Sequence, residues 1–470
     1  MDKKKVKQYI SNWIEENEKE FIAIAKELHR NPELGLCEFA AAKQLEDVLE
    51  KHGFCVERGV ANLPTAFIAT FGSEGNTVGF NAEYDALPGM SQVPGEDKQC
   101  PVTDGAPGHA CGHNILGTAG CLGAIALKYA MEEAGMKGII KVFGSPAEEI
   151  CIGKPYMARF GCYEGVDFFV DWHPNVYNGV FEEYCSAFFS VKYHFKGKSC
   201  HGNKPWYGKS ALDGAILTTH AIEMLREHIA PNCDDAANTI NYTFTDVGPG
   251  IPNVVPENAT LWVIGRFRTI EQIKDAMKRV DDCAEGCAKA VGIEVVKELI
   301  TVTHDKIPNR TLSEVMYTNL KELGSITLTE EERQYVTRME QAAGYEPMGL
   351  SMEIEEFKEA GTILCDTSEF SWFAPYTTVW LSLAPVAGGW HHWMIASIDG
   401  SEIGFKTMKR AAEIMAYTAV DTIENDELIA SAKAELKERL GGRRYESLIL
   451  DEVTPPYDIN KKIMDEFRVK

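Results

Sequence analysis

The chain has 470 residues, of which 45% are hydrophobic, and a formal net charge of −23 at pH 7. This length allows two domains, or one large domain with a smaller one inserted. The acidic charge argues against nucleic acid or an anionic membrane surface as a partner, because both attract clustered Lys and Arg side chains. The absence of a membrane-spanning apolar run and of a signal region, with thirteen scattered cysteines, favours a cytoplasmic protein with free thiols.

The first part of the chain alternates predicted helices and strands. Apolar residues at helical spacing predict helices over 6–30 and 38–52, and small apolar residues predict a buried helix over 115–127. Four apolar runs are typical of strands, at 65–71, 77–82, 138–144 and 166–170. Strands that alternate with helices predict an α/β unit with a mostly parallel sheet.

A different pattern begins near residue 187. Strands and helices follow in the order strand-helix-strand-strand-helix-strand, at 188–195, 211–228, 238–245, 259–269, 271–290 and 293–300. This is the ferredoxin-like order. We therefore expect residues 187–300 to form an inserted domain, and residues 1–186 and 301–470 to form one discontinuous larger domain. A strand at 378–383 and a helix at 403–423 resume the α/β pattern.

The loop Gly108–Asn114 is the centre of the functional prediction. It places Cys111 and His113 two residues apart, with Gly112 between them and Gly108 before them, and glycines let the backbone bend so that neighbouring side chains converge. A thiolate and an imidazole are good ligands for a borderline-soft ion such as zinc. Taken alone, such a pair is more often a buried thiol beside hydrogen-bonded histidines.

Residues that bind metals or move protons also follow the predicted strands, namely Glu83, Asp85, Glu148, Glu149 and His173. In open α/β sheets, functional groups collect at the carboxyl ends of the strands. We therefore expect these side chains to lie close to the Cys-His loop, although each alone could be a solvated loop charge.

A pair of metal ions about 3.5–4 Å apart needs a bridging ligand, further ligands for each ion, and a water between them. The chain offers five candidate ligands: Cys111, His113, Glu149, His173 and His391. Adjacent carboxylates point different ways on an extended backbone, so Glu149 can bind metal while Glu148 acts as general base. Asp85 would orient a ligand histidine.

Seven motifs span nearly the whole chain: residues 83–88, 109–114, 146–149, 171–174, 198–201, 252–256 and His391. In this order they resemble the dinuclear zinc amidohydrolases and exopeptidases, a family that includes aminoacylases, carboxypeptidase G and hippurate hydrolase. Asn114 in place of the commoner Asp, together with segments 366–372 and 441–445, resembles one subgroup that has a related sister subunit.

The resemblance implies a zinc-exopeptidase-like mixed sheet flanked by helices, with the inserted ferredoxin-like domain serving dimerisation. It implies a metal-dependent amidohydrolase or metallopeptidase that cleaves the amide of N-acyl or N-aroyl amino acids. Two divalent ions, zinc or manganese, would be held by the five candidate ligands, with Glu148 as base. The partners would be a small-molecule amide substrate and a second copy of the chain, or a sister subunit.

The resemblance also assigns residues of the inserted domain. His201 would reach into the neighbouring subunit's site to stabilise an oxyanion. Asn253 would contact the substrate, and Arg266 would bind its carboxylate, with Arg268 on the same strand face as the alternative.

Some alternatives remain open at this stage. His391 and His392 compete for the last ligand position, and we prefer His391 because it aligns with the family's histidine before Trp. Glu83 departs from the Asp that the wider subgroup usually carries. The chain could instead be a dipeptidase or a general N-acyl-amino-acid deacylase, or a subunit that is active only with a sister chain. The complete ligand set argues against a silent chain.

Overall fold

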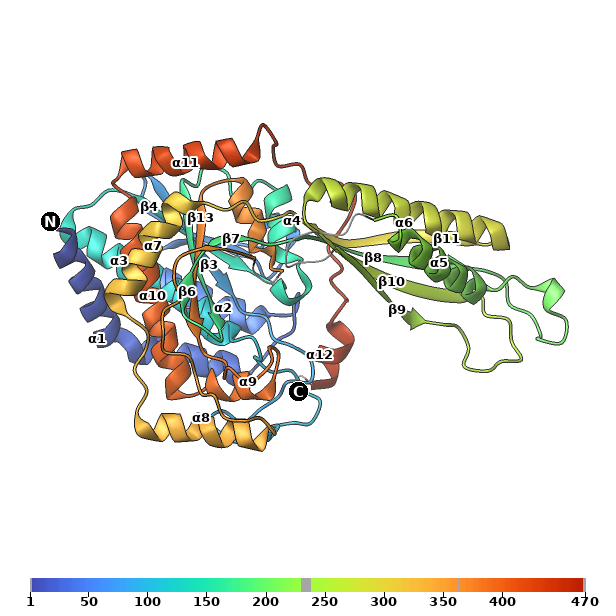
Figure 1. The fold of residues 1–470 in the computed structure, drawn as a ribbon, viewed down its shortest axis with the longest axis horizontal. Coiled ribbons are helices and arrows are strands. Elements are labelled where there is room, and N and C mark those ends of the chain that lie inside the picture. The colour runs from blue at the N-terminus through green and yellow to red at the C-terminus, as the bar shows by residue number, and fades with distance from the viewer. Residues whose placement is uncertain (1, 230–237, 362–363, 468–470) are drawn as a thin grey trace.

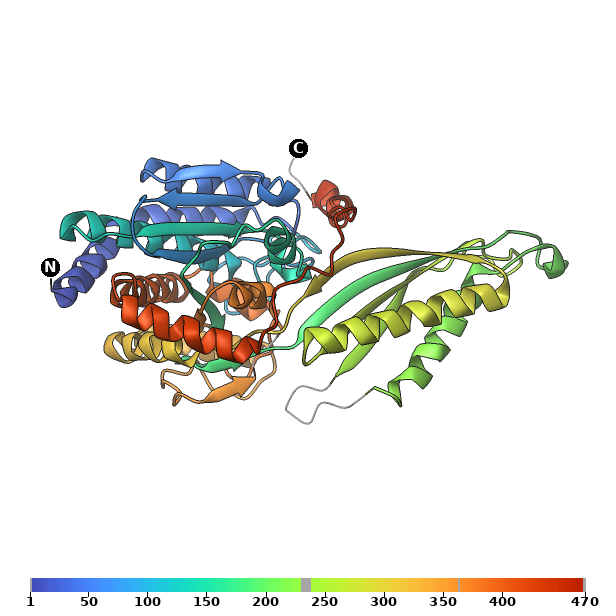
Figure 2. The same ribbon diagram turned by 90° about the horizontal axis from the view of Figure 1, so that it is seen from above.

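The computed structural model describes residues 2–229, 238–361 and 364–467, which form a large unit and an elongated small unit (Figures 1 and 2). The large unit is built on a seven-stranded sheet in the order β1-β2-β4-β3-β5-β13-β6. These strands are β1 (Cys55–Arg58), β2 (Phe67–Phe71), β3 (Thr77–Glu83), β4 (Ile139–Ser145), β5 (Phe168–Asn175), β6 (Gly179–Val180) and β13 (Tyr376–Ser382). The central pairs β4-β3, β3-β5 and β5-β13 are parallel, and the outer pairs are antiparallel. The predicted mixed sheet is confirmed.

Helices cover this sheet, and α3 (His113–Ala134) is the buried helix predicted from its small residues. A Cβ atom at Gly117 would lie 2.3 Å from the backbone oxygen of Glu83, and one at Gly120 would lie 2.1 Å from that of Asn81. Only glycine therefore allows α3 to lie so close to β3. The other helices of the large unit are α1 (Lys3–Arg30), α2 (Phe39–Lys51), α4 (Gly153–Arg159), α7 (Arg310–Leu323), α8 (Glu330–Ala342), α9 (Trp393–Ile398), α10 (Glu402–Thr422), α11 (Asp426–Leu440) and α12 (Lys461–Phe467).

The small unit has a four-stranded antiparallel sheet in the order β11-β8-β10-β9. Its strands are β8 (Ala187–Lys196), β9 (Thr239–Asp246), β10 (Asn258–Phe267) and β11 (Glu294–Thr303). The helices α5 (Ala211–Arg226) and α6 (Ile270–Val291) cover one face of the sheet (Figure 2). This is the predicted ferredoxin-like arrangement, with β11 continuing three residues beyond the expected end at residue 300.

Short elements complete the description. A separate two-stranded parallel sheet joins β7 (Glu182–Tyr184) to β12 (Glu359–Gly361). Four 3-10 turns are η1 (Val60–Asn62), η2 (Glu148–Ile150), η3 (Pro205–Tyr207) and η4 (Asp366–Trp372). None of the described helices is long and apolar enough to cross a bilayer.

One prediction about the sheet was wrong. We expected a strand at 166–170 that ends where residues 171–174 begin, but β5 continues to Asn175. The reason is that β13 pairs with β5 in parallel from Phe169 to Asn175, so the hydrogen-bonded ladder runs beyond the predicted end. His173 therefore lies within a strand and not beyond its end.

Candidate metal centre

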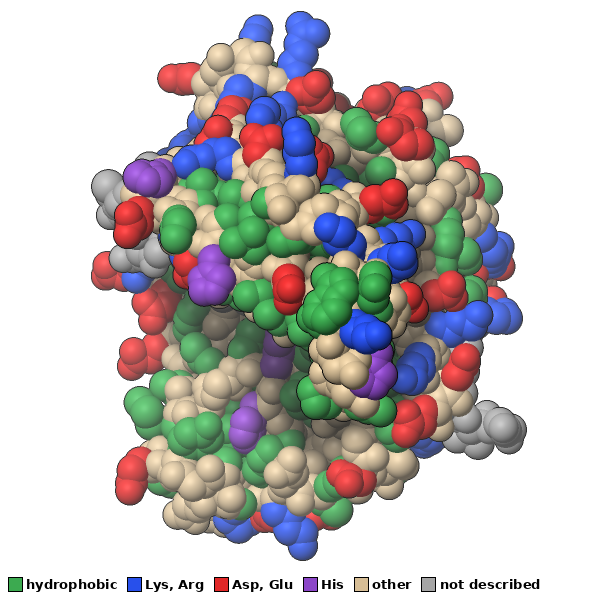
Figure 3. Space-filling view, turned by 90° about the vertical axis from the view of Figure 1, so that its right-hand side faces the viewer, with side chains coloured by type: hydrophobic (Ala, Val, Ile, Leu, Met, Phe, Trp, Pro, Cys, Tyr) green, Lys and Arg blue, Asp and Glu red, His purple; other side chains and the backbone are tan. Residues whose placement is uncertain are grey.

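The predicted metal ligands meet at the carboxyl end of the parallel strands, as open α/β sheets lead one to expect. They come from four parts of the chain: Cys111 and His113 directly before and at the start of α3, Glu149 in η2 after β4, His173 near the end of β5, and His391 in the loop between β13 and α9. All but His391 have side chains that are at least nine-tenths buried, and the His391 side chain is 45% exposed. Figure 3 shows a hollow in this face of the molecule with histidine side chains inside it.

Two groups of possible ligands share one cysteine. The ligand atoms of Cys111, His113 and His173 lie within 4.8 Å of one another, and so do those of Cys111, Glu149 and His391. The Cys111 Sγ lies 3.6 Å from His173 Nε2, and His391 Nε2 lies 3.3 Å from Glu149 Oε2. Two atoms that bind one tetrahedral ion at usual lengths are about 3.3–3.6 Å apart. These distances suit two ions with Cys111 common to both.

Unpaired buried atoms support this fit. His113 Nε2 and Glu149 Oε1 have no hydrogen-bond partner among the described residues. Buried polar atoms without partners are costly, and a bound cation would satisfy both. Asp85 holds the two residues in place, because its carboxylate accepts from His113 Nδ1 at 3.0 Å and from the Glu149 backbone N–H at 3.0 Å. Such a contact fixes the ring so that Nε2 faces the metal groups.

The backbone around the ligands is strained. Ala147 and Cys151, on either side of η2, have φ angles of 55° and 53°, and His391 has a φ of 57°. Residues other than glycine keep this left-handed conformation only where the surroundings impose it, often at functional sites. Gly112 also has a positive φ of 80°, and a Cβ atom there would lie 3.0 Å from the Pro174 ring.

Electrostatics separates the roles of the ionisable groups. Burial, followed by the nearby Glu83 carboxylate, raises the pKa of Glu148 well above its usual range. A carboxyl group with a raised pKa can exchange a proton near neutral pH. Burial lowers the pKa of His173 to about 4, so its imidazole is neutral and able to bind a metal.

The structure places the two competing histidines differently. His391 belongs to a ligand group, whereas a ring nitrogen of His392 accepts a hydrogen bond from the Met394 backbone N–H at 3.4 Å and caps α9. His109 is buried in the same loop as Cys111 but belongs to neither group around that cysteine.

The predicted residues of the small unit lie away from these groups. His201 pairs with Val254 in an isolated bridge, and the Gly202 N–H donates to the Asn253 oxygen at 2.6 Å. His201 and Asn253 are exposed in loops at the outer end of the sheet (Figure 1). The structure therefore does not bring His201 or Asn253 to the metal groups of their own chain.

Arg266 lies at the opposite end of the same sheet. It pairs with Phe188 near the start of β8, and its Nη1 lies 3.5 Å from Asn241 Oδ1. The guanidinium of Arg268 lies 3.9 Å from the centre of the Tyr184 ring. Because a ten-residue strand is about 30 Å long, Arg266 is separated from the outer loops by about that distance.

Residues that the sequence did not single out complete the site. Lys154 is fully buried, with Nζ 2.7 Å from Glu83 Oε1 and 2.5 Å from Asp366 Oδ1. A lysine among small and apolar residues, five positions after Glu149, is a signal that could have indicated a buried charge. Its partner Asp366 lies 212 positions away in the sequence, so the pairing itself was invisible.

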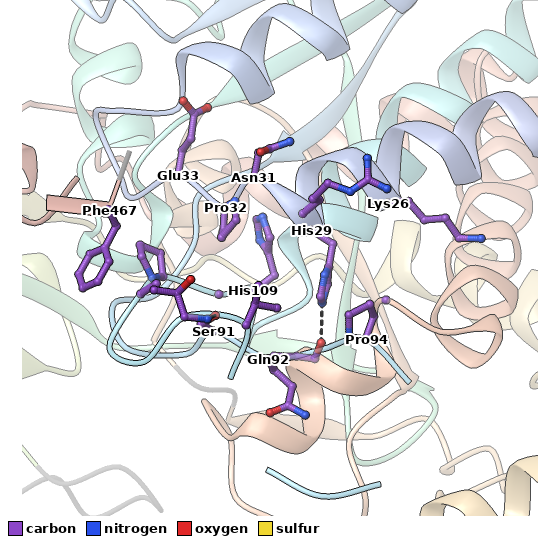
Figure 4. Close-up of a pocket in the computed structure, with 18 of the residues that line it drawn as sticks. Lys26, His29, Asn31, Pro32, Glu33, Ser91, Gln92, Pro94, His109 and Phe467 are labelled. Carbon is purple, nitrogen blue, oxygen red and sulfur yellow. Dashed lines mark hydrogen bonds between the residues drawn. The ribbon is translucent and has the colours of Figure 1, made fainter. Parts of the chain in front are cut away.

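A cavity of about 720 Å³ reaches the metal-bearing loop at Gly108 and His109 (Figure 4). Its walls include His29, whose Nε2 lies 2.6 Å from the Ala396 oxygen, and Phe467 of α12. None of the five candidate ligands lines it. The cavity is therefore distinct from the metal centre.

Glu38 is fully buried behind the metal loop and supports one prediction. Its carboxylate accepts from the Ala147 N–H at 2.7 Å and from the Thr65 hydroxyl at 3.1 Å. Burial and then Asp85 raise its pKa from 4.5 to about 8. The folded state thus holds this proton more tightly than the unfolded state, and this contribution to stability falls as pH rises between those values.

We expect Glu38→Gln to become more stable relative to the wild type as pH rises from 5 to 8, since glutamine keeps the shape without titrating. Chemical unfolding midpoints of both proteins at several pH values test this. A difference in midpoint that stays constant across the range would contradict it.

Taken together, the fold and the site define a class: a mixed sheet whose parallel strands bring together candidate ligands for metal, joined to a ferredoxin-like second unit. Comparisons with known proteins agree. Residues 186–290 match the model of the peptidase dimerisation domain, M20_dimer. The chain is 31% identical to a subunit of the p-aminobenzoyl-glutamate hydrolase of Escherichia coli K12, over 95% of this chain and 98% of that protein.

Two further relatives are more distant. The chain is 28% identical to Xaa-Arg dipeptidase of Mus musculus, over 69% of this chain and 73% of that one. A Bacillus subtilis structure described as a dinuclear metal binding peptidase from the M20 family has a TM-score of 0.56, with 18% identity, 87% of this chain and 99% of that chain covered.

The chain belongs to the M20 family of amidohydrolases and peptidases, and it is a hydrolase of amide bonds. Within the family, the subgroup indicated by Asn114 and the two C-terminal segments is that of the p-aminobenzoyl-glutamate hydrolase relative. The predicted resemblance is thereby confirmed.

Proposed function

We propose that this chain hydrolyses the amide bond of N-acyl and N-aroyl amino acids, with p-aminobenzoyl-glutamate as the preferred substrate. The observation that carries the proposal is the pair of ligand groups that share Cys111, with Glu148 beside them. The similarity to the Escherichia coli p-aminobenzoyl-glutamate hydrolase chain over nearly the whole length supports the choice of substrate.

Two divalent ions, zinc or manganese, would complete the site. Cys111, His113 and His173 would hold one ion, and Cys111, Glu149 and His391 the other. Sulfur and imidazole ligands suit zinc, while the carboxylates also admit manganese. When bound, such ions act as Lewis acids that polarise the scissile carbonyl and acidify water.

Glu148 is the general base in this mechanism. Its Oε2 lies 3.7 Å from His113 Nε2, so the carboxylate faces the space between the ligand groups. It takes a proton from the attacking water and passes it to the leaving amine nitrogen. Asp85 holds the His113 ring and the Glu149 backbone in place during both proton transfers.

The two ends of the small unit would serve different active sites. We assign residues 187–300 to an inserted dimerisation and lid domain, and residues 1–186 and 301–470 to the catalytic domain. Arg266 would bind the substrate carboxylate, while His201 and Asn253 would act in the site of a second subunit. The length of β10 supports this division, because one small substrate cannot touch both ends of a strand about 30 Å long.

The surface for a second copy lies at the β9 edge of the small unit. Among the described strands, β9 has a neighbour on one side only, and its Tyr242 hydroxyl donates to Glu223 of α5 at 2.7 Å, which places α5 at the same edge. On α5, Ile216, Leu217 and Met224 are exposed. An open strand edge beside exposed apolar side chains is suited to pairing between two copies.

His201 gives a direct test of the shared active site. We expect His201→Ala to lower kcat by about 10²–10³-fold, the cost of losing an oxyanion donor. Mixing it with Glu148→Ala should restore activity, because each mixed dimer has one site with both residues intact. Random exchange between two-fold dimers predicts about a quarter of wild-type activity. Absence of any recovery after verified exchange of subunits would contradict a shared site.

The substrate is tested with purified, metal-loaded protein and a panel containing p-aminobenzoyl-glutamate, N-acetyl amino acids, hippurate and dipeptides. We expect kcat/KM to be highest for p-aminobenzoyl-glutamate. Preference for a dipeptide would favour the second candidate, a dipeptidase, which the similarity to Xaa-Arg dipeptidase supports. Turnover that appears only after a related sister chain is added would show that the active form is a heteromer.

A further inference from the structure

A fully buried cluster of charges lies directly beside the metal centre. It consists of Glu83 at the end of β3, Lys154 in α4 and Asp366 at the start of η4. None of the three side chains is more than 1% exposed. Besides its two Nζ contacts, Lys154 donates from its backbone N–H to Asp366 Oδ2 at 3.3 Å. Lys154 and Asp366 are thus joined by both side chain and backbone.

The lysine explains why these acidic groups lie together. Glu83, Cys365 and Asp366 have ligand atoms close enough to hold an ion. However, Lys154 Nζ already lies between the two carboxylates and provides the positive charge. A buried ammonium persists only when it is paired in this way. This group is therefore an ion-pair network and not another metal site.

Glu83 presents its two oxygens to different surroundings. Oε1 accepts from Lys154 Nζ at 2.7 Å and from Asn81 Nδ2 at 2.8 Å. Oε2 is buried and has no hydrogen-bond partner among the described residues. The network thus fixes one oxygen and leaves the other facing the metal centre.

The free oxygen of Glu83 faces a free nitrogen. Oε2 lies 3.5 Å from His113 Nε2, which is also buried and unpartnered in the described structure. This separation is too long for a good hydrogen bond, but it equals the spacing of two ligands of one tetrahedral ion. Because Asp85 accepts from Nδ1, the Nε2 lone pair is available to a cation.

We propose that Glu83 is an additional ligand of the ion held by His113, and that Lys154, backed by Asp366, is the positioning residue that aims it. The inference rests on the metal centre of the proposed function. Lys154 and Asp366 neutralise each other outside the centre.

The test measures metal binding directly. Metal-free protein is titrated with Zn²⁺ in the presence of a competing chelator, and the two affinities are determined for the wild type, Glu83→Gln and Lys154→Met. We expect both variants to bind one ion at least about tenfold more weakly, while the affinity for the other ion changes much less. With Co²⁺ in place of Zn²⁺, the visible absorption of that ion should change in Glu83→Gln.

Lys306→Met is the matched control. Lys306 Nζ forms a buried ion pair with Glu183 at 2.8 Å, and both side chains are at most 4% exposed, but neither residue belongs to a ligand group. Its loss should leave both zinc affinities unchanged. If Lys306→Met weakens zinc binding as much as Lys154→Met does, the loss of affinity is explained by general destabilisation, and the proposal is overturned.

Two ions bound by Glu83→Gln with wild-type affinities and an unchanged Co²⁺ spectrum would also overturn it. If circular dichroism shows that Glu83→Gln or Lys154→Met is unfolded, Glu83→Asp and Asp366→Asn replace them, with weaker binding of one ion again expected. The substrate assignment can fail separately. A wild-type protein that shows no turnover, but whose binding of one ion depends on Glu83, would support this inference and reject only the substrate assignment.

Discussion

Replacing Glu148 with alanine is expected to lower kcat for p-aminobenzoyl-glutamate by about 10²–10⁴-fold, the usual contribution of a general base. Both metal ions should remain bound, because Glu148 is not one of the five assigned ligands and the two groups around Cys111 stay complete. Steady-state kinetics and metal analysis on the same preparation measure the two effects together. KM should change little, since the side chain acts on the water and not on the substrate.

The neighbouring residue provides the contrast. Glu149→Ala should lose both activity and one ion, because Glu149 Oε2 lies 3.3 Å from His391 Nε2 in its ligand group. Both alanine variants are thus expected to lose turnover, but only Glu149→Ala is expected to lose a metal ion as well. A Glu148→Ala protein that keeps wild-type kcat with full metal content would remove Glu148 as the base.

Replacing Cys111 with alanine should have the other large effect. Cys111 belongs to both ligand groups, so its loss is expected to weaken both ions, by at least about tenfold each, and to reduce turnover to background. Titration with Zn²⁺ and a competing chelator measures the affinities. Loss of only one ion would show that Cys111 does not bridge the two.

Cys121→Ala is the matched control for that substitution. Cys121 is another fully buried free thiol in α3, but it belongs to no ligand group in the described structure. Alanine there also removes one buried Sγ atom, from the helix that follows Cys111. We expect both ions to remain bound, with at most a modest loss of stability from the small cavity.

The sequence predicted most of the elements because local patterns specify them. Helical periodicity gave α1 and α10 to within a few residues, and the glycine-rich run predicted that α3 is buried. The features of the sheet that the sequence did not predict were the short edge strands β1 and β6 and the full length of β5. The extension of β5 depends on hydrogen bonds to β13, which follows some 200 residues later, and no pattern within 166–175 indicates that partner.

The candidate ligands could be predicted because metal chemistry restricts residue types. The carboxyl ends of parallel strands lie at the same edge of a sheet. Thiolate, imidazole and carboxylate groups that follow successive strands are therefore brought close together at that edge. The choice between His391 and His392 could not be predicted in this way, since adjacent histidines have the same chemistry. The backbone separates the two rings: His391, with its left-handed φ, lies beside Glu149, while His392 caps α9.

The sequence by itself therefore determined the fold class, the family resemblance and four of the five candidate ligands, since each follows from residue type and spacing. Only the tertiary structure decided that Lys154 joins Glu83 to Asp366 and that His201 lies far from the metal centre of its own chain. The physical reason is distance along the chain. Buried ion pairs and the separation of the two ends of a sheet arise when remote segments pack together, and neither leaves a periodic signal in the sequence.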